Sequence, residues 1–125
     1  MLQEAMKTLE DAEAKAAEIV KEAGIVGMGG AGFPTHVKLS PKEPEKIDYV
    51  IANCAECEPY LTSDYRRMIE NPELLVGGMK VLLQIFPQAK GVIAVEDNKS
   101  EAIAILRRHL PDWPGVELAV LPTRY

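Results

Sequence analysis

The chain is organised around residues 27–38, which read Gly27-Met28-Gly29-Gly30-Ala31-Gly32-Phe33-Pro34-Thr35-His36-Val37-Lys38, with four glycines in the first six positions. Glycine at this density costs backbone entropy on ordering and contributes no side-chain burial, so a packing role rarely needs it. Its common use is to turn backbone N–H groups toward a ligand as an anion-binding nest. A flexible linker is the alternative, but the segment lacks serine spacing and ends in a stiff Phe-Pro pair. The pattern therefore predicts a cofactor-contacting loop.

The segment before this loop has the pattern of an amphipathic helix. Over residues 3–23, apolar residues recur at intervals of three and four, and charged residues occupy the other positions. Gly24 is well placed to end the helix in the left-handed conformation. We expect an N-terminal helix within residues 1–24 that packs on the domain, with coiled-coil pairing to a partner as the alternative.

The segment after the loop alternates predicted strands and helices. A polar connection containing two prolines spans residues 39–46. Buried strands rich in β-branched residues are expected at 47–53, 91–95 and 116–121, and helices at 64–70, 72–86 and 100–110. We expect Asn71 to cap the second of these helices and Asn98 or Ser100 to cap the third.

The helix expected at 72–86 is apolar over much of its circumference. This pattern predicts that the helix is largely buried. Gly77 and Gly78 lie inside it, where each costs about 1 kcal/mol relative to alanine. We expect the two glycines to permit close approach to the sheet or to the glycine loop.

The order of these elements predicts the fold class. Two consecutive β-α-β units imply parallel strands with right-handed crossovers, so we expect an α/β fold with a Rossmann-like parallel sheet and flanking helices. Ligands of such sheets bind beyond the carboxyl ends of the strands. Two polar clusters, residues 53–59 and 96–99, follow predicted strands, and the glycine loop is expected to reach the same edge. We expect these three segments to converge on one crevice.

Length and composition narrow the class of protein. The 125 residues are 47% apolar, which suits one domain over 1–125 with a real core. The net charge is −5 and no basic stripe is present, which argues against nucleic-acid binding. No apolar run approaches the ~18 residues of a membrane span, and the N-terminus lacks a signal sequence, which favours an intracellular protein. Because the chain ends just after a predicted strand, we expect a truncated part of a longer protein.

The two common phosphate-binding motifs do not fit the glycine loop. A dinucleotide fingerprint requires the order strand, glycine turn, helix, but here the glycines follow a helix. A Walker loop places lysine directly after its last glycine, whereas Lys38 comes six residues after Gly32. Spacing alone therefore predicts only a backbone-lined site for a flat or anionic ligand.

Cys54-Ala55-Glu56-Cys57 forms a C-x-x-C motif at the end of the first predicted strand. Such a motif suggests a dithiol or half of a metal site. Neighbouring acids would raise the thiol pKa values, and only His36 and His109 are available as further histidine ligands. We favour ordinary turn residues and keep a metal or dithiol site as the alternative.

Several acids follow the first two predicted strands. Glu56 and Glu58 are expected to lie near Glu96 and Asp97, where they form either a solvated acidic rim or acceptors for the N–H and hydroxyl groups of a ligand. Lys38 is the compensating cation. Phe33 either belongs to the core or stacks on a planar ring.

Three motifs resemble a known family. The segments GMGGAGFPTHVKL (27–39), NCAECEPYLTSD (53–64) and VEDNK (95–99) are similar to the C subunit of the Rnf electron-transport complex. They are more distantly similar to the cobalamin reductase of propanediol metabolism and to the NADH-binding flavoprotein subunit of respiratory complex I. The resemblance implies a domain that binds FMN without a covalent bond, accepts hydride from NADH and passes electrons to iron–sulfur clusters.

The resemblance also implies roles for individual residues. The flavin loop would comprise Gly27, Gly29, Gly30, Ala31, Gly32 and Lys38. Phe33 would lie where the family stacks the nicotinamide nucleotide, and Asn53 and Glu56 would contact the flavin or its ribityl chain. Glu58 would lie toward NADH, and Glu96 would lie near the dinucleotide. No side chain has an acid–base role in this scheme, because the flavin carries the hydride.

The chain departs from the family pattern at two positions. Cys54 stands where the Rnf pattern more often has glycine, and Ala55 stands where complex I relatives have an acid. Four-cysteine motifs are absent, so [4Fe-4S] clusters are expected only in the full-length protein. The resemblance further implies partners in the other subunits of a complex and a cytoplasmic, peripheral position on the inner face of the cell membrane.

Overall fold

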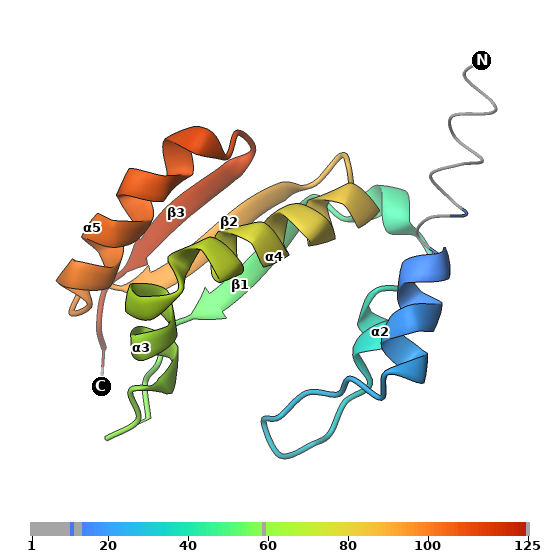
Figure 1. The fold of residues 1–125 in the computed structure, drawn as a ribbon, viewed down its shortest axis with the longest axis horizontal. Coiled ribbons are helices and arrows are strands. Elements are labelled where there is room, and N and C mark those ends of the chain that lie inside the picture. The colour runs from blue at the N-terminus through green and yellow to red at the C-terminus, as the bar shows by residue number, and fades with distance from the viewer. Residues whose placement is uncertain (1–10, 12–13, 59, 125) are drawn as a thin grey trace. The chain divides into compact units, whose positions relative to one another are not determined.

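The computed structural model describes residues 11, 14–58 and 60–124. The chain divides into two compact units, Met1–Lys46 and Ile47–Tyr125, and each is described by itself (Figure 1). Much of the helix predicted over 3–23, and of the N-terminal region 1–24, lies outside the described residues. The single domain predicted over 1–125 stays a prediction. Within the described part of the chain, no helix is both long and apolar enough to cross a membrane.

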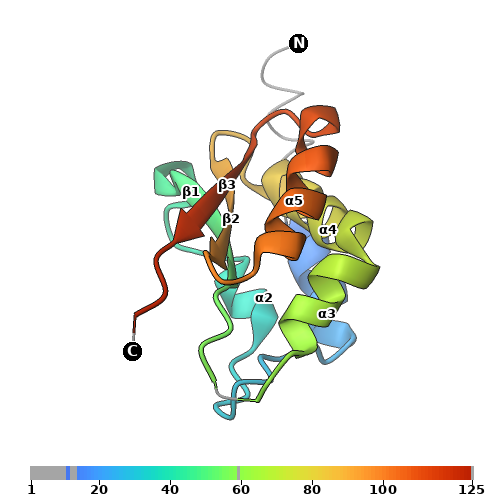
Figure 2. The same cartoon turned by 90° about the vertical axis from the view of Figure 1, so that its left-hand side faces the viewer.

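The second unit contains one parallel sheet. Its strands are β1 (Tyr49–Cys54), β2 (Lys90–Glu96) and β3 (Val116–Leu121), in the order β1-β2-β3. The connecting helices are α3 (Ser63–Glu70), α4 (Pro72–Ile85) and α5 (Ser100–His109). Figure 2 shows the strands on one side and the three helices on the other. The predicted α/β class and both β-α-β units are confirmed, and the predicted bounds differ by at most two residues.

The core lies between the helices and one face of the sheet. Its largest fully buried side chains come from both layers and are Met68, Val76, Met79, Ile93, Val95 and Leu106. At Gly91, an added Cβ would lie 3.0 Å from the side chains of Met79 and Leu83, so helix α4 approaches the sheet here. The expected close approach at Gly77 and Gly78 is wrong among the described residues, because an added Cβ at either meets no atom within 4 Å.

The strand expected at 47–53 and the helix expected at 72–86 are less buried than predicted. Tyr49 and Ile51 on β1 are 57% and 61% exposed, and Leu74 and Val81 on α4 are 60% and 58% exposed. The reason is topological: right-handed crossovers in the order β1-β2-β3 place every helix on the same face. Within the described residues of the second unit, the outer side of α4 and the opposite face of β1 therefore have no covering layer.

The helix caps match the predictions only in part. Asn71 is the N-cap of α4, with Pro72 as its first residue, as predicted. The N-cap of α5 is Lys99, so the prediction of Asn98 or Ser100 is wrong by one residue. No side-chain capping bond is made at the N-cap of α3, α4 or α5. For α4 and α5, packing of the apolar faces, rather than a bond from the N-cap side chain, therefore stabilises the helix.

The first unit contains helical residues 14–22, which end in a Schellman motif. Gly24 has φ +67°, its N–H donates to the Lys21 carbonyl at 3.0 Å, and the Ile25 N–H donates to the Val20 carbonyl at 3.2 Å. The left-handed conformation predicted for Gly24 is confirmed. A short helix α2 (Thr35–Lys38) and a 3₁₀ turn (Pro44–Lys46) complete this unit.

Candidate functional site

The glycine loop is a closed hairpin-like loop within the first unit. Val26 and Pro34 form an isolated antiparallel bridge at its base. The Gly27 N–H donates to the Phe33 carbonyl at 2.8 Å, and the Thr35 N–H donates to the Ile25 carbonyl at 3.1 Å. Helix α2 starts directly after this bridge. These bonds fix both ends of the loop and leave residues 28–32 as its tip.

The tip of the loop exposes its backbone. Gly30 and Gly32 have φ +93° and +59°, a conformation that side-chain-bearing residues rarely adopt. An added Cβ at Gly29, Gly30 or Gly32 would meet no atom within 4 Å, so the loop has open space beside its backbone. Such a segment is able to bring its N–H groups close to a ligand.

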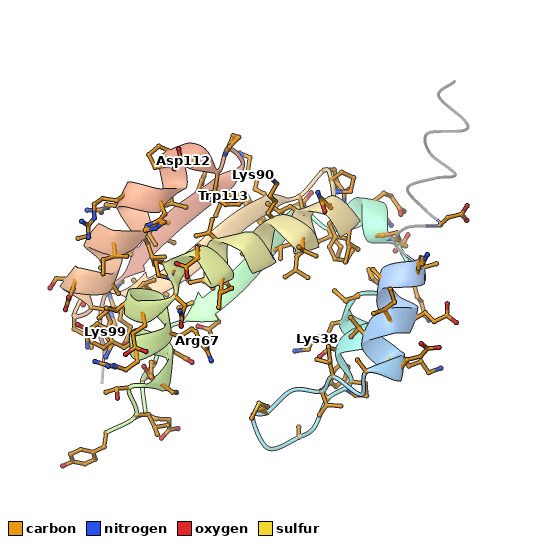
Figure 3. The ribbon with its side chains drawn as sticks, viewed as in Figure 1. Lys38, Arg67, Lys90, Lys99, Asp112 and Trp113 are labelled. Atoms are coloured by element: carbon orange, nitrogen blue, oxygen red, sulfur yellow. The ribbon has the colours of Figure 1, made fainter. Side chains whose placement is uncertain are left out.

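Phe33 and Lys38 flank the loop and face each other. The Lys38 Nζ lies 5.6 Å from the centroid of the Phe33 ring, within the range of a cation–π contact. Phe33 is 46% exposed, so its ring does not belong to the buried core. An aromatic surface and a positive charge therefore lie side by side in this unit. Lys38 is labelled in Figure 3.

The two polar clusters predicted at strand ends lie at one edge of the sheet. Strand β1 ends at Cys54, which pairs with Val95, and β2 ends one residue later at Glu96. Figure 3 shows Lys99 and Arg67 near this edge, far from Lys90 and Trp113 at the other end of the sheet. The edge carries a hollow of about 380 Å³ between the β1–α3 connection and residues Asn98 and Lys99.

Glu56 anchors the start of helix α3. Its Oε2 accepts a hydrogen bond from the Tyr65 N–H at 3.0 Å, and its Oε1 accepts bonds from the Asp64 N–H at 3.2 Å and the Ser63 hydroxyl at 3.3 Å. Thr62, the N-cap residue, makes no side-chain capping bond, so Glu56 supplies the cap from outside the helix. The sequence does not indicate this role, because Glu56 lies seven residues before Ser63, the first residue of α3.

The pKa of Glu56 reflects these bonds. Partial burial acts to raise it, but the amides of Tyr65 and Asp64, the Ser63 hydroxyl and the charge of Lys99 together hold the pKa below its usual 4.5. A carboxyl with a lowered folded-state pKa stabilises the fold above its unfolded-state pKa. That contribution is lost as the pH falls through the folded-state pKa.

We expect Glu56→Ala to destabilise the protein by about 1 kcal/mol at neutral pH, because α3 loses its cap. The difference from wild type should begin to shrink as the pH falls below about 4.5, where the carboxyl of the unfolded chain binds a proton, and should be lost as the pH falls through the lower folded-state pKa. Urea unfolding over a descending pH series measures both effects. Glu58→Ala, at an exposed acid two residues away, is the control and should leave stability unchanged. A pH-independent loss in Glu56→Ala would contradict the capping role.

Glu96 is a buried carboxylate at the end of β2. It is 7% exposed, and its Oε2 has no hydrogen-bond partner among the described residues. Because Ile93 and Val95 face the helices, strand alternation places Asn53 and Glu96 on the opposite face of the sheet. The Asn53 Oδ1 accepts the Ala55 N–H at 3.2 Å. A buried acceptor without a donor is costly, and native proteins keep such groups mainly for function.

Asp97 holds the segment that follows β3. Its Oδ1 accepts the Thr123 hydroxyl at 2.6 Å and the Thr123 N–H at 3.1 Å. These two bonds from Thr123 are the main reason that the pKa of Asp97 lies below its usual value. The neighbouring acids Glu96 and Asp97 therefore differ: Asp97 is engaged in a structural contact, whereas the Oε2 of Glu96 has no partner among the described residues.

The two cysteines have different environments. Cys54 is buried in the core, and burial, with a smaller effect from the charge of Asp64, raises the pKa of its thiol to about 11. Cys57 is exposed. Across the described ranges, no three His, Cys, Asp or Glu side chains are grouped so as to hold a metal ion.

We expect iodoacetamide to modify Cys57 in the native protein and to leave Cys54 unmodified. Burial raises the pKa of the Cys54 thiol to about 11, so at neutral pH it is protonated, and the thiolate is the reactive form. Peptide mass spectrometry after a timed reaction measures the labelling of each residue. Unfolding in guanidinium should equalise the two rates, and equal rates before unfolding would show that Cys54 is not buried.

The chain is similar to one protein family and to several individual proteins. The Nuo51 FMN-binding domain family matches residues 20–125. The chain is 48% identical over 107 residues to the C subunit of the proton-translocating ferredoxin:NAD(+) oxidoreductase complex of Clostridium ljungdahlii. It is 46% identical over 119 residues to the C subunit of the Na(+)-translocating ferredoxin:NAD(+) oxidoreductase complex of Acetobacterium woodii. It is also 44% identical over 106 residues to the C subunit of the ion-translocating oxidoreductase complex of Edwardsiella ictaluri.

These matches cover most of this chain but a minor part of each relative. They span 86%, 94% and 85% of the chain, and 23%, 27% and 13% of the three relatives. The similarity to the C subunit of such complexes, predicted from residues 27–39, 53–64 and 95–99, is confirmed.

Proposed function

The chain belongs to the Nuo51 FMN-binding domain family, and we propose that it is the flavin-binding part of an electron-transport subunit. In this proposal the full-length protein takes electrons from NADH through FMN and passes them to iron–sulfur clusters outside this chain. The names of the similar subunits, each part of a translocating oxidoreductase complex, support the proposal. The partners would be the other subunits of such a complex, with this domain held peripherally at the inner face of the membrane.

The observation that carries the proposal is the unpartnered carboxylate of Glu96. Its Oε2 is buried without a donor among the described residues, at the sheet edge where ligands of parallel sheets bind. FMN offers suitable donors, because its ribityl chain carries hydroxyl groups and its ring carries an N–H. We propose that Glu96 accepts one of these and that Asn53, on the same face of the sheet, binds a second polar group of the flavin. Glu96 and Asn53 therefore suit the ribityl chain or the ring of FMN, which are uncharged and carry hydrogen-bond donors.

The glycine loop of the first unit has the properties of a phosphate-binding segment, and we propose that it binds FMN. The phosphate of FMN is an anion, and the open backbone of Gly29, Gly30 and Gly32 is able to donate N–H groups to it. Gly27 and Ala31 complete this loop, and Lys38 adds positive charge beside Phe33. The half-exposed Phe33 ring provides an apolar face on which the nicotinamide nucleotide stacks.

The residues of the chain position the reactants and supply no acid–base group. Bound FMN would supply hydride acceptance and the release of single electrons. Glu58 lies on the rim of the hollow and is proposed to face NADH. Glu56 holds the start of α3, so we propose that it supports the flavin site by fixing this segment and contacts the cofactor with any acceptor capacity that remains.

An absorbance spectrum of the purified full-length protein tests the proposal. We expect flavin bands that bleach when NADH is added without oxygen. The double variant Cys54→Ser, Cys57→Ser should retain the bands, since neither thiol is proposed to bind FMN. A wild-type protein that shows no flavin bands and takes up no added FMN would contradict the proposal and favour an interaction module with the same fold. Bound metal that disappears in the double variant would favour a metal or dithiol site instead.

A further inference from the structure

Tyr60 combines a strained backbone with an unpacked side chain. It has φ +65°, and among the described residues it is the only non-glycine residue with a positive φ. Its side chain is 103% exposed, so the ring has no packing contact that would offset the strain. A bulky residue in the left-handed region costs about 1–2 kcal/mol. Folding of this domain therefore gains nothing from a tyrosine at this position, where glycine would fit without strain.

Tyr60 lies on the rim of the hollow of about 380 Å³ at the carboxyl edge of the sheet. Asn98, Lys99 and Glu58 also line the hollow, so its lining residues include both hydrogen-bond donors and acceptors. The Lys99 Nζ lies 5.3 Å from the ring of Tyr65 in α3, which places this part of the hollow on the helix side of the sheet. Asn53 and Glu96, the proposed flavin contacts, project from the opposite face.

Glu58, which is proposed to face NADH, lines the same hollow as Tyr60. We propose that Tyr60 is a stacking residue for the dinucleotide and that its ring covers a planar ring of NADH bound in this hollow. The inference rests on the proposed function, because it assumes that NADH is the electron donor. Aromatic side chains bind planar heterocycles through their faces, so the ring of Tyr60 acts and its hydroxyl does not. The donors and acceptors of Asn98, Lys99 and Glu58 then bind the polar groups around that heterocycle.

The test compares three substitutions in the full-length protein: Tyr60→Phe, Tyr60→Ala and Tyr60→Gly. Steady-state oxidation of NADH gives kcat and KM, and flavin fluorescence after denaturation gives the FMN content. We expect Tyr60→Phe to retain the wild-type KM. Tyr60→Ala and Tyr60→Gly should raise the KM for NADH by about 2- to 12-fold, the value of an aromatic contact, with kcat and FMN content unchanged.

The glycine variant separates stacking from a structural role. Glycine relieves the positive-φ strain, so Tyr60→Gly should melt at a higher temperature than Tyr60→Ala while both lose the ring. The proposal is supported if the KM for NADH is raised in both Tyr60→Ala and Tyr60→Gly, which lack the ring, whatever the difference between their melting temperatures. A wild-type KM in both Tyr60→Ala and Tyr60→Gly, or a loss of FMN with no change in KM, would overturn it. A wild-type protein that binds FMN but is not reduced by NADH would instead overturn the proposed function, and this inference with it.

Discussion

Replacing Gly30 with aspartate is expected to abolish FMN binding by the full-length protein, with a loss of affinity of about 100-fold or more. Gly30 lies at the tip of the glycine loop with φ +93°, and the space beside its Cα is open. An aspartate side chain would fill the space through which the backbone approaches the ligand. Its carboxylate would also repel the phosphate of FMN at short range.

Gly115 offers a closely matched control for this substitution. It has φ +90°, no atom lies within 4 Å of an added Cβ, and it lies in the turn before β3, away from the carboxyl edge of the sheet. Gly115→Asp should therefore cause a similar backbone strain and leave FMN affinity unchanged. Gly30→Ala adds the size without the charge and should give an intermediate loss. Fluorescence titration of the flavin-free proteins with FMN measures all four affinities, and wild-type affinity in Gly30→Asp would show that the loop does not bind the cofactor.

Replacing Glu96 with leucine should have two effects of opposite sign. The flavin-free protein should gain about 1–3 kcal/mol in its free energy of unfolding, because the substitution removes a buried carboxylate oxygen without a partner among the described residues. FMN affinity should fall by about 10- to 100-fold, because a hydrogen bond to a charged acceptor is lost. Urea unfolding of the flavin-free protein and FMN titration measure the two effects separately.

Two further variants make this result specific. Glu96→Gln keeps the shape and one acceptor oxygen without the charge, and it should lose less FMN affinity than Glu96→Leu. Glu117→Leu removes an exposed carboxylate from β3 on the same face of the sheet, and its stability should stay within about 0.5 kcal/mol of wild type. If Glu96→Leu destabilised the flavin-free protein, Glu96 would have a structural role rather than the proposed ligand-binding one.

Much of the fold could be predicted because local signals agree with each other. β-branched runs indicate the three strands, the Asn71-Pro72 pair indicates the start of α4, and Gly24 indicates the end of the first helix. The alternation of strands and helices then requires parallel pairing, which places residues 53–59 and 96–99 at one edge. These conclusions need no knowledge of which side chains meet.

The errors arise where burial depends on neighbouring layers. Ile51 and Leu74 have the same apolar character as buried residues, but both are exposed because all three helices cover one face. In the candidate site, too, the contacts of individual side chains could not be predicted from the sequence. The sequence predicts acids at the sheet edge, but it carries no indication that Glu56 caps α3, that Asp97 binds Thr123, or that Glu96 Oε2 has no donor among the described residues.

The α/β order, the glycine loop and the family can be recognised from the amino-acid sequence alone, because each depends on residues that are close together along the chain. Which acids are already engaged in structural contacts depends on the tertiary fold, because the bonds from Ser63, Asp64 and Tyr65 to Glu56 and from Thr123 to Asp97 join residues seven or more positions apart. The tertiary structure also shows that Tyr60 has a strained backbone and a fully exposed side chain. A backbone angle and an exposed fraction are set by the packing of the whole domain, and no local pattern encodes them.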